Sequence, residues 1–414
     1  MKLGKYHPQT KLVQNFKPRE KGAVNKPIYQ STSFNYSTAE ELEKVFNNKE
    51  EGFVYSRINN PTNRDLEEKL NQLEDGIGAV VTSSGMAAIS VALLSLLNRG
   101  DHLVAGSALF GGTYNFIKKN LKSKGIESSF VEPADIRGFQ QAVNSHTKAI
   151  FIESVGNPGL EIPDILEVSS VAQNHDIPLL VDNTFLTSYL FRPGEYGADV
   201  SIYSASKYIN GSANSLGGII IDQGSFDWTK DKLTSLKDYR QYGAYTYLAK
   251  IRQDTFRNLG STASPFNSFL NDLGLGTLGL RMEKHCANAL ELAHFFKNHS
   301  SVQNVKYPGL SSHPQREIVK KQFAGKGSGV LTLELKNKKQ CFQLINNLDL
   351  VKNMANLGDI RTLIIHPAST IYSSLSEKEW DNMGITSGLL RVSVGIEEIK
   401  DIKKDFVKAL KKTT

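Results

Sequence analysis

The chain has 414 residues, of which 40% are hydrophobic and 22% are charged. This ordinary globular composition excludes a disordered chain and a fibrous repeat, and it leaves room for two or three domains that need no disulfide or metal in order to fold. The formal net charge is +7, spread along the whole chain, which indicates a basic surface and supports nucleic-acid binding only weakly.

The two cysteines, Cys286 and Cys341, lie far apart in the sequence. Their spacing favours a reducing compartment and argues against a cysteine-built metal site, so no metal is predicted. The N-terminal residues lack the apolar core of a signal peptide, and the longest apolar stretch, around 87–97, is too short to span a bilayer. We therefore expect a cytoplasmic protein.

The first part of the chain is polar. Residues 1 to about 35, with the basic run 17–21, show no period and predict an extended arm that lies on something else, such as a partner subunit. Two helices are expected between about 36 and 74, and Pro61 is expected to start the second one.

From there to about residue 255, short apolar runs alternate with amphipathic stretches. Strands are predicted at 79–82, 102–105, 128–131, 149–152, 179–181 and 200–203, with a buried helix at 86–94. Ile165, Val168 and Ala172 recur at helical spacing. Buried strands that alternate with helices predict an α/β fold with a mostly parallel sheet.

The pattern of apolar and polar residues changes after about residue 255. We expect one long helix over 273–296, a half-exposed strand at 329–335 whose residues alternate, and a final amphipathic helix that carries Ile399, Ile402, Phe406 and Leu410. These elements predict a smaller α+β C-terminal domain. The expected division is an N-terminal arm with a partner-subunit loop (1–60), a large domain (61–255) and a small domain (256–414).

A candidate anion site lies where the first predicted strand ends. Ser84 follows that strand, and a helix begins at once with Gly85 and Met86. Free backbone N–H groups at a helix N-terminus suit a phosphate. The alternative is that Ser84 only caps the helix and Gly85 only makes the turn.

Asp182 and Lys207 each follow a buried strand. Desolvation disfavours an ammonium and so makes a lysine able to form a Schiff base, and the flanking Ser204 and Ser206 could bind a phosphate. Asp182 could pair with a protonated ring nitrogen. The alternatives are an exposed strand-end lysine and a turn aspartate. Together with the anion site, these groups supply the three attachments that pyridoxal phosphate needs, so this cofactor is predicted.

The chain resembles the Cys/Met-metabolism (trans-sulfuration) family of pyridoxal-phosphate enzymes from about Pro27 to Leu410. The resemblance rests on motifs at 55–62, 84–88, 111–114, 181–185, 204–208, 366–370 and 390–397. It implies an aspartate-aminotransferase-like (fold type I) architecture, a small amino-acid substrate and a homotetramer built from two active dimers. It implies no nucleic-acid or membrane partner.

The resemblance also implies roles for individual residues. Lys207 is similar to the Schiff-base lysine and proton shuttle of the family. The other matching positions are the pyridinium partner Asp182; the phosphate site of Ser84, Gly85, Met86, Ser204 and Ser206; Tyr55 and Arg57 from the neighbouring subunit; Phe110, stacked on the cofactor; Asn157, near its phenolic oxygen; and the substrate residues Arg391, Asn356 and Tyr372.

Segments 111–115, 224–228, 260–267 and 356–359 resemble the homocysteine-forming sulfhydrylases, which act on O-acetyl- or O-succinyl-homoserine. This implies γ-replacement by sulfide or a small thiol. A γ- or β-lyase is the alternative, which Gly112 disfavours because methionine γ-lyases usually carry cysteine there. Phe110, Ser212 and Tyr372 depart from residues common in the family and bear on the substrate. A basic binding protein without the chemistry is the rival of a different class.

Overall fold

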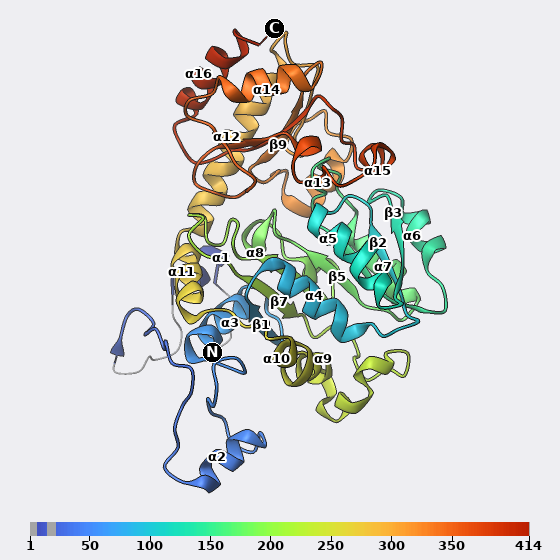
Figure 1. Cartoon of the computed structure of the whole chain (residues 1–414), viewed down its shortest axis with the longest axis vertical. Helices are drawn as coiled ribbons and strands as arrows, with labels where there is room; N and C mark the ends of the chain where they lie inside the picture. Colours follow the sequence, from blue (N-terminus) through green and yellow to red (C-terminus); the bar gives the residue numbers. More distant parts are fainter. Residues whose placement is uncertain (1–5, 15–21, 414) are drawn as a thin grey trace.

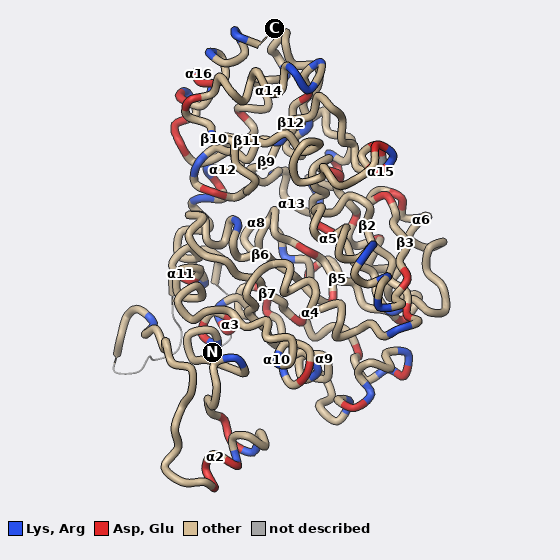
Figure 2. Tube along the Cα trace, in the orientation of Figure 1, with Lys and Arg blue, Asp and Glu red and all other residues tan. Residues whose placement is uncertain are grey.

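Two β-sheets with their covering helices lie one above the other along the molecule in this computed structural model, which describes residues 6–14 and 22–413 (Figure 1). The basic run 17–21 lies outside the described residues. Lys, Arg, Asp and Glu are interspersed along both parts of the trace (Figure 2). No helix in the described ranges is long and apolar enough to cross a membrane.

The first sheet has seven strands in the order β1-β7-β6-β5-β4-β2-β3. Strand β7 is antiparallel to both of its neighbours, and the pairs β6-β5, β5-β4, β4-β2 and β2-β3 are parallel. The predicted α/β class with a mostly parallel sheet is confirmed, although β7 was not predicted. The strands are β1 Gly78–Thr82, β2 His102–Gly106, β3 Glu127–Val131, β4 Thr147–Glu153, β5 Leu179–Asp182, β6 Val200–Ser204 and β7 Gly218–Asp222.

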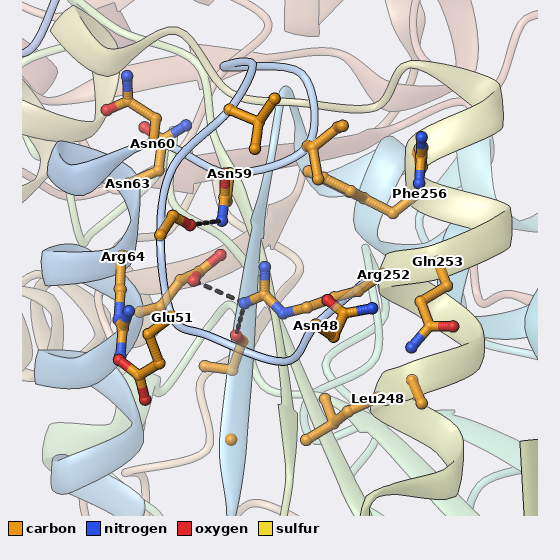
Figure 3. A pocket seen from close by; sticks show the side chains of 18 of the residues that line it. Asn48, Glu51, Asn59, Asn60, Asn63, Arg64, Leu248, Arg252, Gln253 and Phe256 are labelled. Carbon is orange, nitrogen blue, oxygen red and sulfur yellow. Dashed lines mark hydrogen bonds and ion pairs between the residues drawn. The ribbon is translucent and has the colours of Figure 1, made fainter. Parts of the chain in front are cut away.

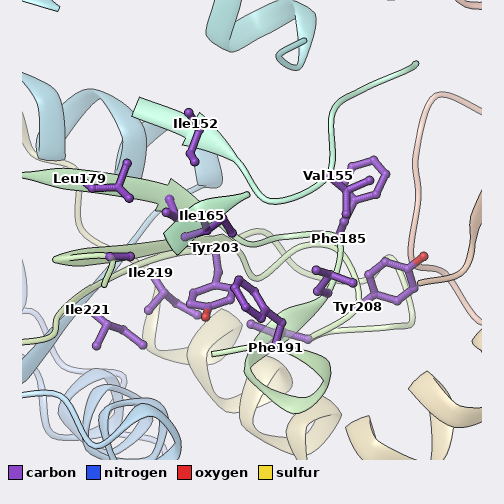
Figure 4. Close-up of a cluster of buried hydrophobic side chains, with 14 of the residues drawn as sticks. Ile152, Val155, Ile165, Leu179, Phe185, Phe191, Tyr203, Tyr208, Ile219 and Ile221 are labelled. Carbon is purple, nitrogen blue, oxygen red and sulfur yellow. The ribbon is translucent and has the colours of Figure 1, made fainter. Parts of the chain in front are cut away.

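Helices cover both faces of this sheet, which explains why its strands read as continuous apolar runs. Successive residues face opposite clusters: Val81 packs on the side of α3, and Val80 packs on the side of α4. Figure 4 shows the first of these clusters, with Leu179 and Ile219 contributed by the strands. The helical elements of this part are α3 Pro61–Glu74, α4 Gly85–Leu96, α5 Gly111–Asn115, η3 Phe116–Leu121, α6 Ile136–Ala142, α7 Ile165–Asn174, α8 Thr187–Leu190, η4 Pro193–Tyr196, η5 Thr234–Tyr245, α9 Thr246–Lys250, η6 Ile251–Thr255 and α10 Phe256–Leu259.

The second sheet has five strands in the order β10-β11-β12-β9-β8. Its own core cluster includes Ile402 and Phe406, so the predicted final helix is confirmed. The elements are α11 Pro265–Gly276, α12 Leu278–Lys297, β8 Asn304–Lys306, α13 Arg316–Phe323, β9 Val330–Glu334, α14 Lys338–Asn346, β10 Lys352–Asn353, β11 Leu363–Ile365, η7 Pro367–Ser369, α15 Glu377–Asn382, β12 Leu389–Ser393 and α16 Ile399–Leu410.

Two predictions in this region are wrong. The helix expected over 273–296 is two helices, because Thr277 has φ −108° and ψ 4° and breaks the run between α11 and α12. The strand at 329–335 is not half-exposed: Leu331 and Thr332 are both buried. The reason is that β9 is an interior strand between β8 and β12, with Val330 packed into the core of the first sheet.

The N-terminal segment protrudes from the first sheet. Helix α1 (Pro8–Val13) packs on α3, whereas α2 (Ala39–Phe46) lies at the tip of a long excursion (Figure 1). The two arms of this excursion meet in an antiparallel bridge between Ser33 and Tyr55. The predicted helix start at Pro61 is confirmed. The division at 60/61 and 255/256 stays a prediction.

Candidate functional site

The carboxyl ends of six strands meet at one edge of the first sheet. Strands β2 to β6 are parallel, and β1 points the same way because β7 is antiparallel to both β1 and β6. In α/β proteins, ligands bind at this edge. The predicted residues that end or follow these strands are Ser84, Phe110, Asn157, Asp182, Ser204 and Lys207.

Lys207 lies in the turn after β6 and is half-buried. Its Nζ donates to Asn356 Oδ1 at 2.6 Å. Burial first, and the charge of Arg391 second, lower the pKa of Lys207 to about 8. This amine is therefore far easier to deprotonate than an exposed lysine, as a nucleophile or a proton carrier requires.

Arg281 of α12 holds the turn that carries Lys207. Its guanidinium donates to the carbonyl oxygen of Tyr208 at 2.5 Å and to that of Ile209 at 3.2 Å. It also donates to the Gly274 carbonyl at 2.7 Å. Sequence reasoning missed this residue, because one arginine inside a helical pattern looks like an exposed position.

Asp182 ends β5 and is partly buried. Its Oδ1 accepts hydrogen bonds from the backbone N–H of Thr184 at 3.0 Å and from the Thr184 hydroxyl at 2.6 Å. Burial raises the pKa of Asp182 to about 6, against the lowering effect of these two bonds. The Thr184 oxygen also accepts from Ser204 N–H at 2.8 Å, which ties the ends of β5 and β6 together.

The N-terminus of α4 supports both interpretations of Ser84. Its Oγ accepts from Ala87 N–H at 3.1 Å, so it does cap the helix. The N–H groups of Gly85 and Met86 have no acceptor among the hydrogen bonds of the described residues. A Cβ at Gly85 would lie 2.7 Å from Ser204 Cβ, so only glycine lets the helix start this close to β6.

Ser206 contacts the segment that leads into β7. Its Oγ accepts from Gly217 N–H at 3.0 Å, and this bond fixes the start of β7. Ser204 Oγ lies at the first amides of α4, since a Cβ built at Gly85 would fall 2.9 Å from it, so these amides and this hydroxyl line the candidate anion site.

Arg391 comes from β12 of the second sheet and is buried. It donates to Asn157 Oδ1 at 3.0 Å and to the Asn356 carbonyl at 3.1 Å, and burial lowers its pKa. Its Nε is buried and has no hydrogen-bond partner among the described residues, so it is open to an incoming anion. Because Asn356 also accepts from Lys207, one chain of contacts joins the two sheets.

Tyr372 is fully buried, and its hydroxyl donates to the Asn157 carbonyl at 2.7 Å. The ring of Phe110, in contrast, is 39% exposed. Its position depends on Gly112, because a Cβ there would lie 2.6 Å from the ring. The Phe110 N–H donates to Glu153 Oε1 at 2.7 Å, a contact that sequence reasoning did not anticipate.

Tyr55 and Arg57 are not joined to this cluster. In the described part of the chain, no hydrogen bond, ion pair or ring contact links them to Lys207. Arg57 donates to the Arg257 carbonyl at 2.8 Å and stacks over the Tyr55 ring, 5.4 Å from its centroid. Tyr55 is exposed.

A cavity of about 710 Å³ lies beside this segment, between 45–60, α3 and the helices α9 and α10 (Figure 3). Arg252 there pairs with Glu67 at 2.6 Å and donates to the Ala79 carbonyl at 2.7 Å. None of the residues around Lys207 lines this cavity. It lies between the protruding segment and the first sheet with its helices, and not at the edge that carries the predicted chemistry.

The residues at the sheet edge fit pyridoxal phosphate. The free amides of Gly85 and Met86 suit its phosphate, and the orphaned Nε of Arg391 suits a carboxylate. Asp182 has no ion-pair partner among the described residues, which suits a cationic ring nitrogen. Lys207 is held by a neutral amide rather than by a carboxylate, so its amine stays available.

Comparison with known proteins agrees with this arrangement. The family model described as Cys/Met metabolism PLP-dependent enzyme matches residues 9–411. The homocysteine/cysteine synthase of Saccharomyces cerevisiae is 39% identical over 405 residues, covering 92% of this chain and 91% of the relative. The O-acetyl-L-homoserine sulfhydrylase of Corynebacterium glutamicum is 40% identical over 401 residues, covering 93% and 92%.

A solved structure from Campylobacter jejuni, assigned as an O-acetylhomoserine (thiol)-lyase, superposes with a TM-score of 0.91 at 33% identity. The match covers 98% of this chain and all of that one, and that structure contains N'-pyridoxyl-lysine-5'-monophosphate. The predicted fold type I architecture is confirmed by this likeness.

Proposed function

Because this chain belongs to the Cys/Met metabolism family of PLP-dependent enzymes, we propose that it catalyses γ-replacement on an activated homoserine ester. The substrate is O-acetyl- or O-succinyl-homoserine, and the second reactant is sulfide or a small thiol. The bond between Cγ and the ester oxygen breaks, a carbon–sulfur bond forms at Cγ, and the acyl group leaves as its carboxylate. The product is homocysteine or a related amino acid.

The observation that carries this proposal is the meeting of Lys207, Asn356 and Arg391 beside the edge that bears Asp182 and the start of α4. The names of the relatives, homocysteine/cysteine synthase and O-acetyl-L-homoserine sulfhydrylase, support replacement over the lyase alternative. The packing of Gly112 against the Phe110 ring adds to this, since a cysteine there would displace the ring.

Pyridoxal phosphate, when bound, supplies an aldehyde that bonds amines covalently and a protonated ring that withdraws electrons from the substrate. Lys207 Nζ accepts the proton from the substrate Cα and returns protons at later steps, as its lowered pKa allows. Asp182 holds the ring nitrogen protonated by offering a carboxylate. Gly85, Met86, Ser204 and Ser206 hold the phosphate, with Ser84 ordering the helix start.

Arg391 holds the substrate α-carboxylate through a fork of N–H groups. Asn356 positions both Arg391 and Lys207, since its two oxygens accept from each. Asn157 lies against Arg391, and it would hold the phenolic oxygen of the cofactor when that group is bound. Tyr372 serves the substrate side by fixing Asn157, because its hydroxyl is already used there.

The same proposal includes a homotetramer made of two active dimers, with a small amino-acid substrate as its partner and no nucleic acid. Tyr55 and Arg57 would complete the phosphate site of the neighbouring subunit, which agrees with the exposure of both side chains. We place the protein in the cytoplasm. Its two cysteines are free and buried, as in proteins of reducing compartments.

The test is to incubate the purified holoenzyme with each ester, with and without sulfide, and to measure homocysteine. We expect homocysteine only when sulfide is present, and none from Lys207→Ala. No homocysteine from either ester at any pH would refute the proposal. Release of a 2-oxo acid and ammonia without thiol would assign the lyase reaction instead.

A further inference from the structure

Glu153 is a buried carboxyl at the proposed cofactor site that the mechanism above does not use. It ends β4, and in the parallel pair β4-β5 its register partner is Asp182. Side chains of paired residues in neighbouring strands point to the same face of a sheet. The two carboxyls therefore lie side by side at the edge where the cofactor residues gather.

Only 7% of Glu153 is exposed, and its Oε1 accepts the backbone N–H of Phe110 at 2.7 Å. That is the single hydrogen bond that the described residues give this carboxyl. Phe110 is the N-cap residue of α5, and its side chain makes no capping hydrogen bond. Glu153 is thus the group that ties the Phe110 backbone to the end of β4.

We propose that Glu153 is a positioning residue. Its hydrogen bond fixes the Phe110 backbone and thereby the position, beside Asp182, of the ring that stacks on the cofactor. This inference rests on the proposed function, because it takes Phe110 to contact pyridoxal phosphate. A neutral acceptor at position 153 satisfies this role.

The surroundings of Glu153 explain why a neutral acceptor suffices. Burial, and then the neighbouring charge of Asp182, raise the pKa of Glu153 well above its ordinary range. A raised pKa favours the uncharged carboxyl, which an amide resembles closely in shape and charge. Glutamine at 153 should therefore keep the bond to Phe110, whereas leucine should lose it.

The test compares Glu153→Leu and Glu153→Gln with a matched buried carboxylate at the opposite edge of the sheet. Asp199 is 6% exposed and accepts the backbone N–H of Leu179 at 2.9 Å and the Ser225 hydroxyl at 2.6 Å, so Asp199→Leu removes a bond of the same kind, and one more, far from the cofactor. The full-length holoenzymes are assayed for the dissociation constant of pyridoxal phosphate and for the visible circular dichroism of the bound cofactor. Thermal unfolding is followed in parallel.

We expect Glu153→Leu to weaken cofactor binding about tenfold, the loss that one buried hydrogen bond carries, and to change the visible signal. Glu153→Gln should stay within about threefold of the wild type. Asp199→Leu should lower thermal stability but leave both cofactor readouts unchanged. The proposal is overturned if Glu153→Leu binds the cofactor normally, if glutamine fails to rescue, or if Asp199→Leu weakens binding as much.

Hydrogen exchange on the wild-type holoenzyme covers the case in which Glu153→Leu does not fold. The Phe110 amide should then be protected in the wild type and in Glu153→Gln, and fast exchange in the wild type would overturn the proposal. These readouts do not depend on turnover. If only the sulfhydrylase assignment fails, no homocysteine will form, but the Glu153 variants will still show the expected differences in cofactor affinity and visible circular dichroism.

Discussion

Removing the positive charge of Arg391 should raise the pKa of Lys207. Burial and Arg391 together lower this pKa from the ordinary value of 10.5 to about 8. At pH 7 a pKa of 8 leaves about one amine in eleven neutral, against about one in 3,000 for a free lysine, a gain of roughly 300-fold in the reactive form. In Arg391→Gln we expect a pKa above 8 but below 10.5, because burial is the larger cause.

The assay is the rate at which acetic anhydride labels Lys207 in the cofactor-free protein, followed by mass spectrometry as the pH is raised. Only the neutral amine reacts, so labelling rises with pH and levels off above the pKa. Its midpoint should lie near pH 8 in the wild type and in Arg391→Lys, which keeps the cation. A midpoint at or below 8 in Arg391→Gln, or an equal rise in Arg391→Lys, would refute the reasoning.

Three further predictions follow from the same contacts. Asp182→Asn should lower kcat about a hundredfold or more, the range found when a reacting centre loses one electrostatic partner, and Asp182→Glu should be less impaired. A normal kcat for the asparagine variant in steady-state kinetics would contradict the pairing of Asp182 with the ring nitrogen. Mixing the Arg57→Ala and Lys207→Ala proteins should restore up to about a quarter of wild-type activity, because about half of the dimers then carry one complete site out of two. Native mass spectrometry confirms that subunits have exchanged. No recovery after exchange would argue that Arg57 contributes to the site of its own chain. Arg281→Met should lower the free energy of unfolding, measured by urea titration, by about 2 to 4 kcal/mol, because it leaves buried carbonyl groups unpaired. Arg281→Lys should lower the free energy of unfolding by less. An unchanged urea midpoint would mean that water replaces these hydrogen bonds.

Local patterns were enough for much of the first sheet. Strands buried on both faces, such as β4 and β5, read as apolar runs, and Pro61 and the Ser84–Gly85 junction mark helix starts through backbone chemistry that acts within a few residues. The same reasoning failed for Thr277, where the chain turns between two helices although the apolar spacing continues through it. Spacing alone does not reveal such a break.

The sequence by itself determined the set of chemical groups and the strand ends that carry them. Both follow from local features, namely turn residues after apolar runs and the motifs of a known family. The tertiary structure alone decided which groups touch. Glu153 lies beside Asp182 through the strand register, Arg281 reaches the turn of Lys207 from α12, and Arg391 enters from the second sheet. These contacts join residues distant along the chain, and their energies depend on burial, which no stretch of sequence expresses until the whole chain has packed.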